Sequence, residues 1–388
     1  MSAIQDILRA EFPTYLERHG VRPAVRWAAW QMMCCRTAAL GGHAEYCPAG
    51  HYQRSHRNSC KHRSCPECQW LNRERWVAAQ VARFSLACDY HHVLFTVPHE
   101  LNVLWSYNRS LVSDALLRAA SGAVLKQAKA AVHLGAVPGI ISALHTWGRS
   151  MPVHLHAHLL VTGGGYTPEG WVACREEYFL ETEGLGWWFR EKMLRRLRRA
   201  LDAGELVIPG GQSEEDVREA LARAKGLRWF VGTKRQDGGS EGLLQYIGRY
   251  MRGGPIRNSQ IESYEDGRIR FRYHDHKTNS ERTMELPADE FLRRLFEHVP
   301  EPGFRTIRYC GVFAPGNREK LAACREWLGM APYVESAPLT VEQCLARVSL
   351  PPHPTHCPMC GLELVREEIP RPPSRSPPWS TRSLSHVA

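Results

Sequence analysis

The chain has 388 residues, of which 43% are hydrophobic and 23% are charged, an ordinary composition for a globular protein with two or more domains. Fifty Lys and Arg against forty Asp and Glu give a formal net charge of +10, which fits a polyanionic partner without requiring one. No apolar run approaches the roughly 20 residues that cross a bilayer, and the N-terminus lacks the basic start and apolar centre of a signal peptide, so we expect a cytoplasmic protein with reduced thiols and no membrane contact.

Helices dominate the predicted elements of the first third of the chain. Apolar residues at helical spacing predict a helical region over residues 1–33, and a Cys/His-rich segment follows it. A helix with a basic, Trp-bearing face is expected over residues 66–84. Residues 90–97 predict a strand, and the Ala/Leu-rich residues 109–134 predict another helix.

The middle of the chain mixes strands and helices. Two strands joined by the turn-like sequence "GRSMP" are expected over residues 139–147 and 153–162, which predicts a β-hairpin. A strongly basic helix follows over residues 187–204. A short helix, "EGLLQYIGRYM", is expected over residues 241–251. Further strands are expected over residues 227–233, 268–276 and 305–313.

We therefore predict an α+β fold in four parts. The tail is rich in Pro, Ser and Arg, has few apolar residues and is expected to be disordered. The parts are a helical, Cys/His-rich domain (1–85), an α+β domain (86–315), a helical segment with a C-terminal CxxC knuckle (316–365) and the tail (366–388).

Three histidines alternate with apolar residues in the expected strand "VHLHAHLLV". Because side chains alternate faces along a strand, His154, His156 and His158 share one face, and the other face is wholly apolar and should pack on helices. Neutral imidazole is a common metal ligand, so this face predicts a site for a divalent ion. Chance histidines on an exposed edge strand are the plain alternative.

The predicted hairpin supplies a further ligand. If its turn centres near Ser150 and Met151, His145 lies across from His156 on the same face, although a slip of one residue would turn it away. His145, His156 and His158 would then form a three-histidine site with open positions for water and substrate, as catalytic ions have. His91 and His92 are reserve candidates. The HxHxH pattern also fits histidine-triad nucleotide hydrolases.

The segment "LLQYIGRYMRGGPI" places Tyr246 and Tyr250 one helical turn apart. Gly248 between them indicates close approach to another element, and Arg249 and Arg252 add positive charge. Aromatic packing of an amphipathic helix explains the same pattern. Beside a metal site, however, a tyrosine can attack a phosphodiester and keep the bond energy in a phosphotyrosine, which strand transfer needs and hydrolysis does not.

Taken together, these segments resemble the HUH endonuclease superfamily, and within it the two-tyrosine rolling-circle transposases of bacterial insertion sequences (the IS91-like group). The resemblance rests on "LHTWGRSMPVHLHAHLLVTGGG", "YIGRYM", the Cys-rich "NSCKHRSCPECQ" and the C-terminal "CPMCG", in the family's order from about residue 10 to 362. It implies an RRM-like antiparallel sheet, His156 and His158 as paired ligands of Mg²⁺ or Mn²⁺ with His145 as the third, and Tyr246 and Tyr250 as nucleophiles on single-stranded DNA at element ends and target DNA.

The Cys-rich segments predict zinc. Tetrahedral zinc needs two ligand pairs, and we expect them to be Cys47, His51, Cys65 and Cys68, with Cys35, His43 and Cys60 as spares or ligands of a second ion. The family usually has a cysteine where this chain has Gly50, which makes His51 the substitute. The C-terminal pair, Cys357 and Cys360, predicts a second knuckle that His353, His356 or another region completes.

The sequence therefore predicts a DNA transposase, with a zinc-binding DNA-recognition domain over residues 1–85 and a catalytic domain over residues 86–315. Arg249, Arg252, Arg63 and Arg73 are the expected DNA-binding residues, and the basic helix is a candidate groove wall. A histidine-triad nucleotide hydrolase would leave the tyrosines and cysteines without a role. A non-catalytic zinc-finger DNA-binding protein would leave the histidine strand without one.

Overall fold

The structure is a computed structural model that describes residues 2–175, 180–236, 241–242, 244–245, 248, 254–275 and 278–373. The chain divides into two compact units, each built from separated segments. Unit 1 comprises Met1–Asn72, Arg252–Val299 and Leu339–Ala388, and unit 2 comprises Arg73–Met251 and Pro300–Pro338. The predicted parts followed the chain linearly, whereas residues 252–299, expected in the catalytic domain, cluster with the N-terminal helices.

The largest sheet lies in unit 2 and has the strand order β11-β4-β5-β3-β7, with β6 paired to β5. All neighbouring strands in it are antiparallel, as the sequence predicted. Its strands are β3 (Tyr90–Thr96), β4 (Val137–Trp147), β5 (Val153–Tyr166), β6 (Trp171–Ala173), β7 (Phe230–Gln236) and β11 (Ile307–Gly311).

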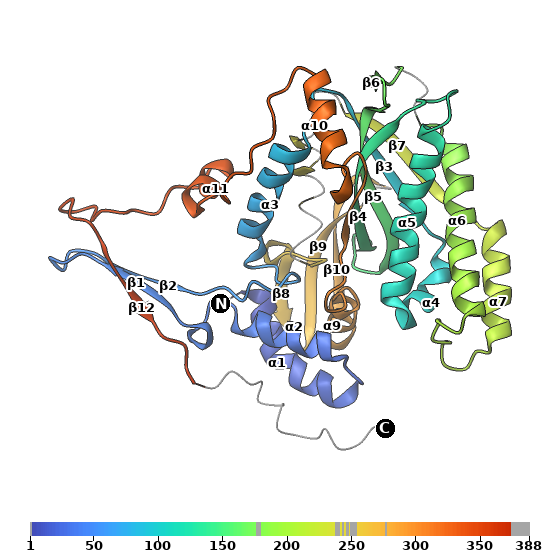
Figure 1. Ribbon diagram of the computed structural model, residues 1–388. Coiled ribbons are helices and arrows are strands. Elements are labelled where there is room, and N and C mark those ends of the chain that lie inside the picture. Colours follow the sequence, from blue (N-terminus) through green and yellow to red (C-terminus); the bar gives the residue numbers. More distant parts are fainter. Residues whose placement is uncertain are drawn as a thin grey trace. The chain divides into compact units, whose positions relative to one another are not determined.

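One face of this sheet is covered by helices α5 and α6 (Figure 1). The apolar positions of β5, from Leu155 to Val161, pack there against Phe95 and Phe189, which confirms the predicted apolar face. The helices that follow in this part of the chain are α4 (Asn102–Tyr107), α5 (Arg109–Ala128), α6 (Thr182–Asp202) and α7 (Glu214–Arg223).

The opposite face packs against α3 (Gln69–Phe84) and α10 (Arg318–Trp327), as Figure 1 shows. Leu160 of β5 lies in this second core with Phe84 and Leu321. His156 and His158 alternate with the apolar set and therefore share the Leu160 face. The sheet thus holds an apolar core at one end of this face and the histidines at the other.

The described residues of unit 1 form helices and two small sheets. The region expected to be helical over residues 1–33 forms two helices, and Phe12 of the first contacts Phe296 with ring centroids 5.3 Å apart. One sheet has the order β10-β9-β8 and the other β12-β1-β2. The elements are α1 (Ala3–Arg18), α2 (Pro23–Cys34), β1 (Gly42–Tyr46), β2 (Gln53–Arg57), β8 (Ile261–Glu265), β9 (Arg268–Asp275), β10 (Ser280–Pro287), α9 (Ala288–Glu297), α11 (Val341–Arg347) and β12 (Val365–Ile369).

The expected disordered tail begins later than predicted. Arg366 to Ile369 belong to β12, which pairs antiparallel with β1, so the boundary at residue 366 was wrong. The sequence did not predict this strand because its residues are mostly charged and lack apolar alternation. Backbone hydrogen bonds to β1, and not an apolar face, stabilise it. Among the described residues, no helix is long and apolar enough to cross a membrane.

Candidate metal centres and nucleic-acid site

The β4–β5 hairpin places three histidines together. His145 on β4 pairs directly with His156 on β5, which is the register that the sequence predicted. His158 follows two positions later on the same face. All three side chains are buried, with exposed fractions of 2%, 8% and 6% in chain order.

The ring nitrogens of these residues converge on one point. Nδ1 of His145 lies 3.2 Å from Nε2 of His156 and 3.1 Å from Nε2 of His158. An ion about 2.1 Å from each nitrogen holds octahedral neighbours about 3.0 Å apart and tetrahedral neighbours about 3.4 Å apart. The distances match this range, so the three imidazoles could hold one divalent ion.

Hydrogen bonds on the outer side of two rings fix which nitrogen faces the site. Nδ1 of His156 donates to the carbonyl oxygen of His154 at 2.7 Å, so a neutral ring presents the lone pair of Nε2. Nδ1 of His158 lies 2.8 Å from Nε2 of His92 on β3. Partners of this kind orient metal-ligating histidines. Trp147 stacks on His145 with ring centroids 5.0 Å apart.

Burial keeps the rings of His156, His158 and His92 neutral. It lowers the pKa of His156 to about 3 and that of His158 to about 2, with smaller contributions from neighbouring histidines and Arg149. Burial and the charge of Lys234 lower the pKa of His92 to about 4. Neutral imidazole is the metal-binding form, so the site is ready for an ion at physiological pH.

The remaining histidines of this region are separated from the cluster. His154 is exposed, and its side chain is not part of the group of converging ligand atoms. Of the two reserve candidates, His92 contacts His158, whereas His91 pairs with Val161 and lies on the other face, 3.9 Å from Cys174. The contribution of His92 depends on the pairing of β3 with β5, which the sequence does not reveal.

The two predicted nucleophiles, Tyr246 and Tyr250, lie outside the described residues, as do Arg249 and Arg252. Their described neighbours locate part of the segment. Leu244 is fully buried in the core formed by α3, α10 and the Leu160 face of the sheet. A Cβ added at Gly248 would lie 2.8 Å from Cγ2 of Val77 on α3, which confirms the close approach expected at this glycine.

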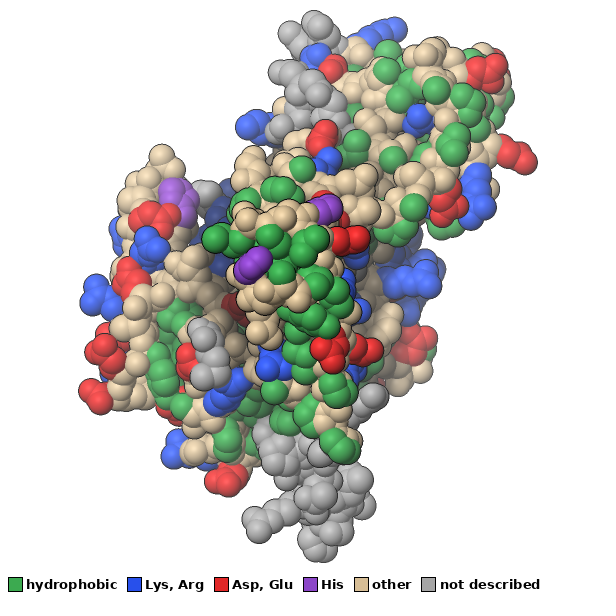
Figure 2. All heavy atoms as spheres, turned by 90° about the vertical axis from the view of Figure 1, so that its left-hand side faces the viewer, with side chains coloured by type: hydrophobic (Ala, Val, Ile, Leu, Met, Phe, Trp, Pro, Cys, Tyr) green, Lys and Arg blue, Asp and Glu red, His purple; other side chains and the backbone are tan. Residues whose placement is uncertain are grey.

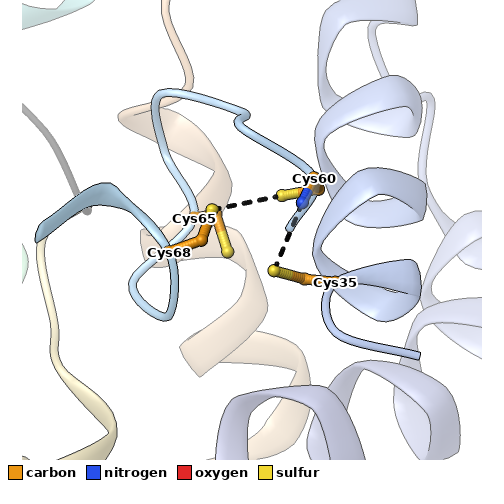
Figure 3. Close-up of side chains that lie close together, drawn as sticks. All are labelled: Cys35, Cys60, Cys65 and Cys68. Atoms are coloured by element: carbon orange, nitrogen blue, oxygen red, sulfur yellow. Dashed lines mark hydrogen bonds between the residues drawn. The ribbon is translucent and has the colours of Figure 1, made fainter. Parts of the chain in front are cut away.

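Four cysteines converge in unit 1, as Figure 3 shows. Cys35 caps the C-terminal end of α2, Cys60 lies in the loop after β2, and Cys65 and Cys68 precede α3. The Sγ atoms of Cys60 and Cys68 are 3.6 Å apart, close to the separation of about 3.8 Å that tetrahedral Zn–S bonds impose. Hydrogen bonds within the cluster lower the pKa of the Cys68 thiol and raise the pKa of the Cys60 and Cys65 thiols, as expected of sulfur atoms in close contact.

The zinc set predicted from spacing is therefore divided. Cys65 and Cys68 lie with Cys35 and Cys60, whereas Cys47 and His51 lie with Cys357 and Cys360. The expectation failed because it assumed ligands close in sequence, whereas the pairing of β12 with β1 brings a distant segment to Cys47. None of the thirteen cysteines, all of which the structure describes, forms a disulfide.

A further polar cluster, on the β1–β2 pair, was missed from the sequence apart from His43. His43 pairs directly with His56 across the strands, and both Nε2 atoms lie within 3.7 Å of the Glu45 carboxylate. Arg54 already donates to that carboxylate at 2.7 Å, and this ion pair competes with a metal ion for it. Cross-strand pairing creates the cluster, so residue spacing alone gives little sign of it.

The basic residues predicted for DNA binding occupy half-buried positions where they are described. Arg73 on α3 forms an ion pair with Glu74 at 3.2 Å, and Arg63 is also half-buried. On the face drawn in Figure 2, Lys and Arg side chains are interspersed with Asp and Glu and do not gather into one continuous basic area. The basic helix corresponds to α6, whose apolar side packs on the sheet.

Comparisons with known proteins agree on one family. A family described as "Putative transposase" matches residues 139–320, and one described as "Transposase zinc-binding domain", of the IS91 type, matches residues 7–97. The chain is 37% identical over 337 residues to "Putative transposase y4qJ" of Sinorhizobium fredii, covering 84% of each chain. It is 30% identical over 367 residues to "Transposase for insertion sequence element IS801" of Pseudomonas savastanoi pv. phaseolicola, covering 90% of this chain and 85% of the relative.

No solved structure matched the chain. The two relatives each match most of its length. The two matched families cover the cysteine-rich region and the histidine hairpin separately. The chain belongs to the IS91-like family of insertion-sequence transposases.

Proposed function

We propose that this transposase is an HUH endonuclease that nicks and transfers single-stranded DNA at insertion-sequence ends through 5′-phosphotyrosine intermediates, by a rolling-circle route. The observation that carries the proposal is the convergence of His145, His156 and His158 on one face of an antiparallel sheet. Leu244, two positions before Tyr246, is buried on the same face, which supports placing the tyrosines near the histidines.

The three histidines are the proposed ligands of a catalytic Mg²⁺ or Mn²⁺. The neutral rings of His156 and His158 and the nitrogen separations of 3.1 and 3.2 Å among the three residues fit a divalent ion. Three imidazoles suit Mn²⁺ better than Mg²⁺, which prefers oxygen ligands. When bound, the ion polarises the scissile phosphate and stabilises the charge that develops on it.

The tyrosines are the proposed nucleophiles. The hydroxyl oxygen of Tyr246 or Tyr250 loses its proton and attacks the phosphorus in line. A phosphorus–oxygen bond to the protein forms while the bond to the 3′ oxygen breaks, and that oxygen takes up a proton to leave a free 3′-OH. The 5′ end stays on the tyrosine, and attack by a 3′-OH reverses the step to join strands. Two tyrosines permit two successive transfers.

Zinc has a separate, structural role in this proposal. The match to a transposase zinc-binding domain and the four converging cysteines support one Zn²⁺ at Cys35, Cys60, Cys65 and Cys68. Arg63, Arg73, Arg249 and Arg252 are the proposed contacts to DNA phosphates. Single strands suit the enzyme because unpaired bases stack on aromatic side chains. The reaction would take place in the bacterial cytoplasm, on the nucleoid.

A cleavage assay on end-labelled oligonucleotides with Mn²⁺ tests the proposal. Single strands that carry an element end should be cut, and matched duplexes should not. The double variant His156→Ala/His158→Ala should lose cleavage while retaining zinc. Hydrolysis of free nucleotides without DNA cleavage would favour the histidine-triad alternative, and DNA binding without any cleavage would favour a non-catalytic zinc-finger protein.

A further inference from the structure

We infer that Cys47, His51, Cys357 and Cys360 form a second zinc site that joins the N-terminal and C-terminal segments of the chain. Their ligand atoms all lie within 4.8 Å of one another. The Sγ atoms of Cys47 and Cys360 are 3.4 Å apart although the residues are separated by 313 positions. Three cysteines and one histidine are a common tetrahedral zinc set.

Two matching turns present these ligands. The N–H of Cys47 donates to the carbonyl of Tyr52 at 2.8 Å, and that of Cys357 donates to the carbonyl of Leu362 at 2.7 Å, in each case five residues further on. Each turn contains a glycine with positive φ, 78° at Gly50 and 72° at Gly361. A Cβ in this conformation is strained, so both glycines serve turns that curl around the cysteine.

Strand pairing brings the two turns together. Cys47 directly follows β1, and the second turn ends at Leu362, shortly before β12 begins at Val365. Tyr46, the last residue of β1, pairs with Val365, the first of β12. The same ladder that aligns the strands therefore sets the two turns side by side.

This small sheet lacks a hydrophobic core of its own. Gly42 is the single buried residue among the strand positions of β1, β2 and β12. Near the C-terminal turn, Met359 and Val365 are 76% and 41% exposed. A three-stranded sheet needs an apolar face or another constraint to be stable. Zinc ligation provides such a constraint, because metal-binding free energy becomes folding free energy.

The family's zinc-binding domain matches only residues 7–97, so the C-terminal half of this site lies beyond it. The inference extends that domain to include residues 357–369. It also explains why this chain can have Gly50 and His51 in place of a second cysteine. Cys357 and Cys360 complete the four ligands without a cysteine at residue 50.

Zinc counting on the purified full chain tests the inference. After dialysis against zinc-free buffer, Cys47→Ser and Cys357→Ser/Cys360→Ser should each bind one Zn²⁺ fewer per chain than the unaltered protein. The triple variant should also lose one ion in total, because all three residues hold the same one. Cys174→Ser, a cysteine outside the metal-ligand groups, should lose none.

The exposed residue His51 gives a test that does not threaten the fold. His51→Ala should lose or weaken the same zinc, and His51→Cys should retain it as a four-cysteine site. Loss of two ions from the triple variant would show two separate sites and overturn the inference. So would an unchanged zinc count in every variant, or a disulfide between Cys47 and Cys360 in peptide maps of the unreduced protein.

Discussion

His145 on β4 and His156 on β5 face each other across the β-hairpin, with Nδ1 of the first 3.2 Å from Nε2 of the second. Two ring nitrogens from separate strands therefore meet at a distance that suits one metal ion. His158 adds a third from the same strand as His156. The hairpin register decides this arrangement, because a slip of one residue would move His145 to the opposite face.

Removing a proposed ligand should weaken metal binding strongly. His156→Ala and His158→Ala should each weaken Mn²⁺ binding at least about a hundredfold, because two imidazoles remain where three converge. Isothermal titration with Mn²⁺ measures this. His154→Ala is the matched control: it removes an exposed histidine from the same strand and should leave affinity within about twofold. Equal losses in all three variants would contradict the assignment.

His92 should position His158. His92→Ala removes the partner 2.8 Å from Nδ1 of His158 and should lower Mn²⁺ affinity about 10- to 100-fold. His92→Gln, which keeps a polar atom near that position, should recover part of the loss. His91→Ala, on the opposite face of the same strand, should leave affinity unchanged. If His91→Ala and His92→Ala weaken binding equally, the effect comes from the strand and not from orientation of the ligand.

The contact between Gly248 and Val77 should leave no room for a side chain at residue 248. A methyl group at residue 248 would meet Cγ2 of Val77 at 2.8 Å, so Gly248→Ala should displace the tyrosine segment and reduce DNA cleavage. Overpacking of this kind costs about 1–3 kcal/mol. Val77→Ala should restore cleavage when combined with Gly248→Ala, because it removes the contacted methyl groups. Absence of rescue would place the defect elsewhere.

The unfolding free energy should fall between pH 7 and pH 5.5 because of the buried histidines. Burial lowers the pKa of His156 and His158 well below the ordinary 6.5, so the unfolded chain takes up protons first as the pH drops. The loss is bounded by about 1.4 kcal/mol per pH unit for each histidine. Urea unfolding without added divalent ions measures it. His156→Gln/His158→Gln should show a shallower pH dependence, and identical slopes would argue against this origin.

Local patterns were sufficient to predict the histidine hairpin. Alternation along "VHLHAHLLV" set the two faces of β5, and the short turn set the register that pairs His145 with His156. These features depend on residues close in sequence. The apolar residues at alternate positions of β5 also predicted that this face of the strand is buried.

Long-range pairing limited the prediction of the zinc ligands. Cys35 reaches Cys65 only because α2 ends beside the cysteine loop, and Cys47 reaches Cys357 only through the β1–β12 ladder. The spacing between neighbouring cysteines in the sequence carries no information on either of these long-range contacts. Similarly, His92 approaches His158 through the pairing of β3 with β5.

The central claim is that a tyrosine of this transposase becomes joined to DNA at a histidine-held metal site. The most direct measurement is mass spectrometry of the protein after reaction with a single-stranded element end and Mn²⁺, with peptide mapping of the adduct. The account predicts a bond between a 5′ phosphate and Tyr246 or Tyr250. In each single Tyr→Phe variant this bond should move to the other tyrosine or be lost. In the double variant Tyr246→Phe/Tyr250→Phe it should be absent. Cleavage that persists in this double variant, or an adduct on another residue, would contradict it.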